Sequence, residues 1–104
     1  MTRMLKIAAA TLTAAAMSTT AFAADTKEQS CAHQAAIVSA VQDARLDGVR
    51  EQAVPAAILE AEHSWPDAYD AAIPIIAPWV YQQERRDLRT KDFAGAWSEL
   101  CLQQ

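Results

Sequence analysis

The chain has 104 residues, of which 52% are apolar and 21% charged, and its formal net charge is −4 at pH 7. This length suffices for one small domain, and the acidic balance argues against nucleic-acid binding, which depends on Lys and Arg side chains that neutralise phosphates. Two cysteines, Cys31 and Cys101, constrain the fold and the compartment more than any other residues.

The first 23 residues have the three parts of a secretory signal peptide. Two basic residues near the start are followed by an apolar run over residues 7–17 and then by the small residues Ala21 and Ala23. The apolar run is shorter than the roughly 20 residues that a membrane span needs. We therefore expect cleavage near Ala23, no membrane span, and a single helical domain of residues 24–104 in the periplasm or outside the cell.

The segment after this leader predicts a long first helix over residues 31–46. It is rich in good helix formers, Ser30 can cap its start, and the preceding residues 25–30 are polar. Asp47 and Gly48 end it, because glycine readily takes the left-handed conformation that closes many helices. Apolar residues recur at helical spacing along it, namely Cys31, Ala35, Val38 and Val41.

The next helix is expected to begin near Val54 and to run to Ser64. Pro55 lacks an amide hydrogen and is comfortable only in a first turn, so the helix cannot begin much earlier. A short turn precedes it over residues 50–53. Trp65 ends it, because the residue before a proline is disfavoured in helical geometry.

Pro74 and Pro78 divide the third segment. Each proline inside a helix costs about 3 kcal/mol, so we expect a short helix over 67–72, an irregular or kinked piece over 73–77, and a helix over 78–87 opened by Pro78. Whether the two prolines break or only kink the helix stays open. A buried strand over 73–76 is the alternative, but it has no visible partner strand.

The last helix is marked by capping residues and an apolar stripe. Thr90 can cap it and Asp92 suits its first turn. The stripe consists of Phe93, Trp97, Leu100 and Cys101. The chain as a whole is predicted to be all-α, a small bundle of four to five helices.

The two cysteines are predicted to pair. An even number of thiols in a small exported domain usually forms disulfides, and a Cys31–Cys101 bond would join the first and last helices. In the chain-entropy model such a loop stabilises the fold by roughly 4–5 kcal/mol. The cysteines are too far apart in sequence for the close pairing typical of redox-active sites.

The sequence contains few candidates for catalysis. It has no nucleophile elbow, no phosphate-binding glycine loop and no haem-attachment motif, so we expect a protein without enzymatic activity or cofactor. The alternative is a small metal- or ligand-dependent enzyme or carrier. It would use Glu60 and His63, whose Glu-x-x-His spacing shares one helical face, together with His33.

A candidate interaction surface follows the two prolines. Its members are Trp79, Tyr81, Arg85, Arg86 and Arg89. Exposed apolar surface rimmed with charge marks protein interfaces, which favours a protein partner or an envelope component. The alternatives are that the aromatic residues form a buried connector, and that the arginines belong to a solvated helix end with local ion pairs.

Export, small size, helical content and one long-range disulfide together resemble bacterial acid-stress chaperones of the periplasm. The resemblance implies that acid protonates carboxylates, loosens the fold and exposes the apolar stretch 75–81. The sequence thus predicts a periplasmic binding module, with a stress-related chaperone and a component of an envelope complex as its two variants. The partner and the oligomeric state stay open.

Overall fold

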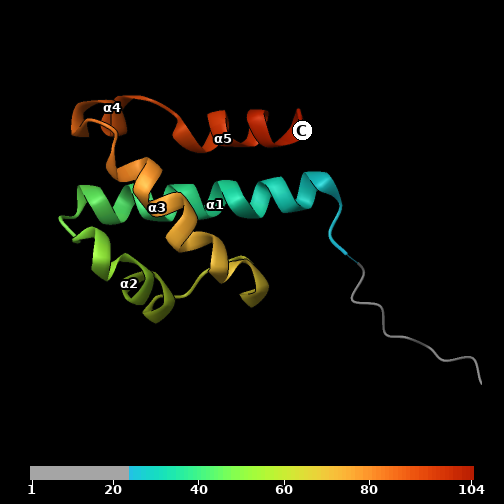
Figure 1. Ribbon diagram of the computed structural model, residues 1–104, viewed down its shortest axis with the longest axis horizontal. Helices are drawn as coiled ribbons and strands as arrows, with labels where there is room; N and C mark the ends of the chain where they lie inside the picture. The colour runs from blue at the N-terminus through green and yellow to red at the C-terminus, as the bar shows by residue number, and fades with distance from the viewer. Residues whose placement is uncertain (1–23) are drawn as a thin grey trace, which may run out of the picture.

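One long helix organises the fold, and the other helices pack around it. The computed structural model describes residues 24–104 (Figure 1), so the predicted leader lies outside the described residues. Within that range the chain forms five α-helices and two short 3-10 helices, with no strand. The prediction of a small all-α domain is confirmed.

Helix α1 (Lys27–Leu46) begins with a capping box. The Thr26 hydroxyl accepts a hydrogen bond from the Gln29 amide at 3.1 Å, and the Gln29 side chain accepts one from the Thr26 amide at 2.9 Å. The predicted start at Ser30 is therefore wrong, because these two reciprocal bonds satisfy free amides one turn earlier. The predicted end is confirmed, with Gly48 at φ +84°.

A 3-10 turn, η1 (Glu51–Ala53), leads into α2 (Val54–Glu60). Pro55 lies in the first turn of α2, as predicted. The predicted end is wrong, since α2 stops four residues before Ser64, where Ala61 takes extended backbone angles (φ −88°, ψ 156°).

Two helical pieces continue directly into one another over the proline-containing segment, η2 (Asp67–Ala72) and α3 (Ile73–Tyr81). Of the irregular or kinked piece predicted over 73–77, the irregular form is wrong, because these residues belong to one α-helix that the two prolines do not break. Pro74 falls in the first turn of α3, where its missing amide costs little, so only Pro78 lies inside the helix. Four buried residues of α3 offset that cost at about 1.5–3 kcal/mol for each large side chain; they are Ile73, Ile76, Ala77 and Val80.

The chain then forms α4 (Arg85–Thr90) and α5 (Phe93–Leu102). The single helix predicted over 78–87 is wrong, because α3 ends at Tyr81 and the buried Leu88 anchors α4 as a separate helix. Asp92, and not Thr90, caps α5, since its carboxylate accepts a hydrogen bond from the Gly95 amide at 2.8 Å.

Helix α1 lies in the middle of the described chain (Figure 1). Helix α5 lies along one side of α1 and runs in the opposite direction, α2 lies on the other side, and α3 crosses in front of α1 in this view. The largest fully buried side chains come from α1, α2, α3 and α4, and they are Ile37, Val38, Val41, Val54, Ile73, Ile76, Val80 and Leu88. In residues 24–104, no helix is both long and apolar enough to cross a membrane.

The predicted disulfide is confirmed. Cys31 on α1 is bonded to Cys101 on α5, with 5.7 Å between their Cα atoms and a separation of 70 positions in sequence. The first and last helices are therefore covalently joined at one end of their contact.

Candidate functional site

A cleft of about 670 Å³ lies between α1 and α2. Helix α1 contributes two rows of residues to it at four-residue spacing, and α2 with the chain just after it forms the facing wall. The lining residues of α1 and its end are Ala36, Ser39, Ala40, Asp43, Ala44, Asp47 and Val49, and those of the facing wall are Ala57, Ile58, Ala61, Glu62, His63, Ser64 and Trp65.

Small side chains keep this cleft open. Ala36, Ala40 and Ala44 follow one another at intervals of four residues, so they lie on one face of α1 over about two turns. Ala57 and Ala61 face them from the other wall. Because an alanine side chain is a single methyl group, it does not fill the space between the two walls. A groove therefore remains between α1 and α2 beside their buried residues.

The rim of the cleft is acidic. Asp43 and Asp47 stand one turn apart on the α1 side, and Glu62 stands on the other side. The three carboxylates are exposed, and the lining residues described above include no Lys or Arg. The site therefore combines an apolar floor with a negatively charged edge, which favours a cationic and partly apolar ligand.

At one end of the cleft, His63 is held by its neighbours. Its Nδ1 lies 2.9 Å from the Trp65 carbonyl oxygen, its ring stacks on the Trp65 indole with 4.5 Å between centroids, and its Nε2 lies 3.6 Å from Oδ1 of Asp70. The indole nitrogen of Trp65 donates a hydrogen bond to the same Asp70 oxygen at 2.9 Å. Asp67 lies close enough for its carboxylate to complete a group of three potential metal ligands with His63 and Asp70.

The second histidine forms a similar but separate arrangement. His33 Nε2 lies 3.7 Å from Oδ2 of Asp25, and the Tyr69 hydroxyl donates a hydrogen bond to that oxygen at 2.7 Å. The Ser30 hydroxyl lowers the pKa of Tyr69, but the hydrogen bond to Asp25, partial burial and the Asp25 charge raise it further, so the net shift is upward. His33 and His63 contact different residues of η2 and do not share a site.

The predicted pair Glu60 and His63 is not on one helical face. Glu60 is the last residue of α2 and is exposed, whereas His63 belongs to the extended chain that follows. The acidic residues that lie close to His63 are Asp67 and Asp70, and Glu60 is not one of them. A usable signal was present in the sequence, because Pro66 opens a helical turn in which Asp67 and Asp70, three residues apart, share a face.

The two aromatic residues of the predicted interaction surface are half-buried. The Trp79 ring lies 5.7 Å from that of Phe93 and 5.3 Å from that of Trp97, both on α5. The Tyr81 hydroxyl donates a hydrogen bond to the Val49 carbonyl. Both side chains therefore contribute to packing between helices.

The arginines of that predicted surface are exposed. Arg86 lies 3.9 Å from the Glu84 carboxylate, with both side chains more than 70% exposed. A neighbouring pair, Lys91 and Asp87, is separated by 3.4 Å. Asp87 is half-buried, and the other three side chains of these pairs are exposed. Ion pairs at a protein surface contribute at most about 1 kcal/mol each. Arg85 and Arg89 are exposed on the same short helix.

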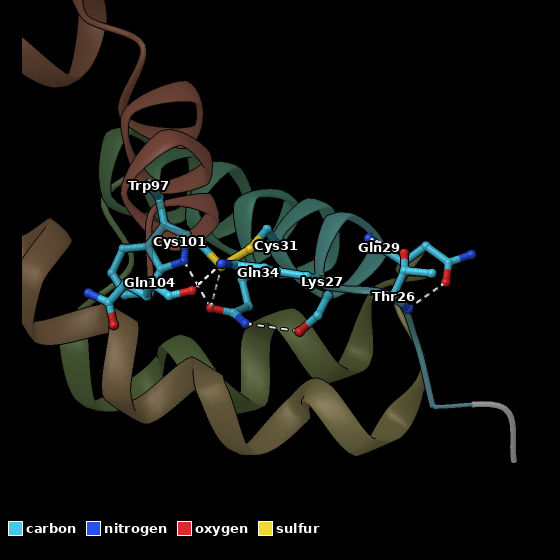
Figure 2. Close-up of a disulfide and its surroundings, with 9 residues drawn as sticks. Thr26, Lys27, Gln29, Cys31, Gln34, Trp97, Cys101 and Gln104 are labelled. Atoms are coloured by element: carbon cyan, nitrogen blue, oxygen red, sulfur yellow. Dashed lines mark hydrogen bonds between the residues drawn. A yellow bond between two sulfur atoms is a disulfide. The ribbon is translucent and has the colours of Figure 1, made fainter. Parts of the chain in front are cut away.

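Figure 2 shows that Gln34 connects the disulfide region to α5. Its side-chain oxygen accepts a hydrogen bond from the Trp97 indole at 3.1 Å, and its side-chain nitrogen donates one to the Ser30 hydroxyl at 3.2 Å. Cys31 is only 1% exposed. At this end of the molecule, the disulfide and the Gln34 hydrogen bond to Trp97 join α1 to α5.

Comparison with known proteins gives no family for this chain. No family model matches the sequence, and neither a curated protein nor a solved structure is similar to it.

Proposed function

We propose that this protein is an exported, non-enzymatic binding module, and that the cleft between α1 and α2 receives a basic amphipathic helix of a partner protein. The acidic rim around an alanine floor is the observation that carries the proposal. The Cys31–Cys101 bond supports export, because disulfides persist mainly in oxidising compartments.

The shape of the cleft favours a helix as its ligand. The alanine row on α1 extends over about 12 Å, at 1.5 Å per residue, so the groove is elongated along a helix axis. Small residues along that floor allow close approach of a second helix, whose apolar face would cover the alanines.

The acidic residues of the cleft rim determine which partner helix would fit. Asp43 and Asp47 are four residues apart on α1, which is also the spacing at which Lys or Arg side chains on a partner helix become neighbours. A partner helix with an apolar stripe flanked by two or more basic residues therefore complements both the floor and the rim. The stretch 79–89 is less suited to this role, since its aromatic side chains already pack against other helices.

A synthetic helical peptide with an alanine and leucine stripe flanked by lysines provides the test. We expect saturable binding, measured by fluorescence anisotropy, and at least about tenfold weaker affinity for the double variant Asp43→Asn/Asp47→Asn, which corresponds to about 1.4 kcal/mol. In NMR spectra, the peptide should shift the amide signals of α1 and α2 that border the cleft.

A matched control separates the cleft from general acidity. The double variant Glu28→Gln/Glu99→Gln removes the same charge from exposed positions outside the cleft, and its affinity should stay within about twofold of the original. Equal weakening in both double variants, or signal shifts centred on 79–89, would contradict the proposal. A stress-related chaperone would instead bind unfolded clients without regard to this basic pattern.

A further inference from the structure

Three side chains at one end of the cleft form a cluster of potential metal ligands. One ligand atom each from His63, Asp67 and Asp70 lies within 4.8 Å of the other two. We propose that these residues bind a divalent transition-metal cation, with Zn²⁺ as the best match. This proposal does not depend on the helix-binding function of the cleft.

The hydrogen bond of His63 determines which ring nitrogen can bind a metal. The Trp65 carbonyl oxygen, 2.9 Å from Nδ1, can only accept a hydrogen bond, so Nδ1 must carry the hydrogen. Nε2 is therefore the coordinating nitrogen, and it faces Asp70. Metal-binding histidines commonly donate their other ring N–H to a backbone carbonyl or a carboxylate in this way.

The distance between His63 Nε2 and Asp70 Oδ1 matches two ligands of one ion. At 3.6 Å it is too long for a hydrogen bond. Two ligand atoms about 2.1 Å from a tetrahedral ion are themselves about 3.4 Å apart. A zinc ion therefore fits between the two atoms with little movement of either side chain.

Trp65 holds both of these ligands in position. It is 6% exposed, its indole stacks on the His63 ring, and its Nε1 donates a hydrogen bond to Asp70 Oδ1 at 2.9 Å. A buried residue that contacts two potential ligands in this way limits their rotation and reduces the entropy lost on metal binding.

Asp67 supplies the third potential ligand, which is the second carboxylate of the group. Because η2 is a 3-10 helix with about three residues per turn, Asp67 and Asp70 lie nearly one above the other. Asp67 is exposed and free to turn toward the ion, whereas the other two ligands are half-buried. A bound cation would offset the electrostatic repulsion between the carboxylates of Asp67 and Asp70.

The donor set indicates the class of metal. One imidazole nitrogen and two carboxylates with an open fourth position suit Zn²⁺, whereas Ca²⁺ takes six to eight oxygen ligands and Mg²⁺ a near-ideal octahedron. The fourth position would be filled by water. An ion pair between His63 and Asp70 is the competing explanation of the same contact.

Calorimetric titration of the chelator-treated protein with Zn²⁺ tests the proposal. We expect one equivalent of Zn²⁺ to bind. Asp70→Asn, which keeps an oxygen for the Trp65 indole, should weaken the affinity at least about tenfold. The matched control is Glu60→Gln, which removes the same charge from the acidic residue of the sequence-predicted pair, and it should leave the affinity within about twofold.

A second readout identifies the ligands directly. On Zn²⁺ addition, the ¹⁵N signals of the His63 ring should shift at Nε2 while Nδ1 keeps its hydrogen, and the His33 signals should stay in place. Absence of heat and of ring shifts at millimolar Zn²⁺ would overturn the proposal and leave an ion pair only. Equal weakening by Asp70→Asn and Glu60→Gln would also overturn it, since it would indicate diffuse attraction to an acidic surface.

The cleft variants keep the two proposals separate. Asp43→Asn/Asp47→Asn changes no proposed metal ligand, so its zinc affinity should equal that of the original protein. Failure of peptide binding with intact zinc binding would therefore count against the cleft alone, and the reverse result would count against the metal site alone.

Discussion

The two sides of α1 are built in different ways. On the side of α5, the Cys31–Cys101 bond joins the two helices, and Trp79 packs against Phe93 and Trp97. On the side of α2, the facing helix has only seven residues, and alanines line much of the contact. One side therefore relies on a covalent bond and large aromatic rings, while the other leaves an open cleft.

This difference shows how a small domain can combine one cross-linked side with another side that has an open cleft. On the α5 side, aromatic side chains pack against one another. On the α2 side, small side chains and exposed carboxylates provide room and charge at some cost in packing. Binding elements are generally drawn from the less stable parts of a protein. We accordingly expect α2 and the chain after it to open more easily than α5.

The largest expected effect is the loss of the disulfide. For a loop of 70 residues, the double variant Cys31→Ala/Cys101→Ala should lower the free energy of unfolding by about 4 kcal/mol. This is a large share of the 5–15 kcal/mol typical of a domain. Urea unfolding followed by tryptophan fluorescence measures the change.

Reduction supplies the control for this prediction. A thiol reductant should destabilise the original protein by a similar amount and should leave the double variant unchanged. Equal urea midpoints for the original protein and the double variant would mean that aromatic packing alone holds α5 against α1. The disulfide would then not explain a difference in stability between the α5 side and the α2 side.

The next effect concerns the buried anchor of α2. Ile58→Ala should cost about 3 kcal/mol, because Ile58 is only 6% exposed and the lost methyl groups leave a cavity. Native-state hydrogen exchange should show that the amides of α2 lose protection first. Leu59→Ala is the matched control, since Leu59 is 48% exposed and its loss should change stability by no more than about 0.5 kcal/mol. Uniform loss of protection across all helices would argue against an independently opening α2.

The features that the sequence predicted correctly depend on local chemistry. Gly48 ends α1 because its backbone takes a positive φ, and Pro55 lies in the first turn of α2 because its missing amide costs nothing there. The pairing of Cys31 with Cys101 needed only their even number and the signal-like leader. None of these inferences requires knowledge of the rest of the fold.

The features that were missed depend on tertiary packing. Pro78 stays inside α3 because the helix buries residues on its inner face, which a propensity argument does not count. Glu60 and His63 separate because α2 ends at Glu60 and His63 lies in the chain that follows. Asp67 and Asp70 lie near His63 only in the folded chain. The cleft could not be predicted, because it depends on how α1 and α2 pack against each other.

The smallest effect concerns Tyr81, which fastens α3 to the end of α1 through its hydrogen bond to the Val49 carbonyl. Tyr81→Phe should cost about 1 kcal/mol at neutral pH, the usual contribution of one such bond.

Partial burial raises the pKa of the Tyr81 hydroxyl, against the opposing charge of Arg45. Because tyrosine in the unfolded chain loses its proton near pH 10, the unfolded state releases protons there first. The stabilisation is therefore complete below about pH 10 and is lost as the pH rises toward the higher pKa of the folded state. Urea unfolding between pH 8 and pH 11 should show a steeper loss of stability for the original protein than for Tyr81→Phe, and parallel curves would mean that this hydroxyl titrates alike in both states.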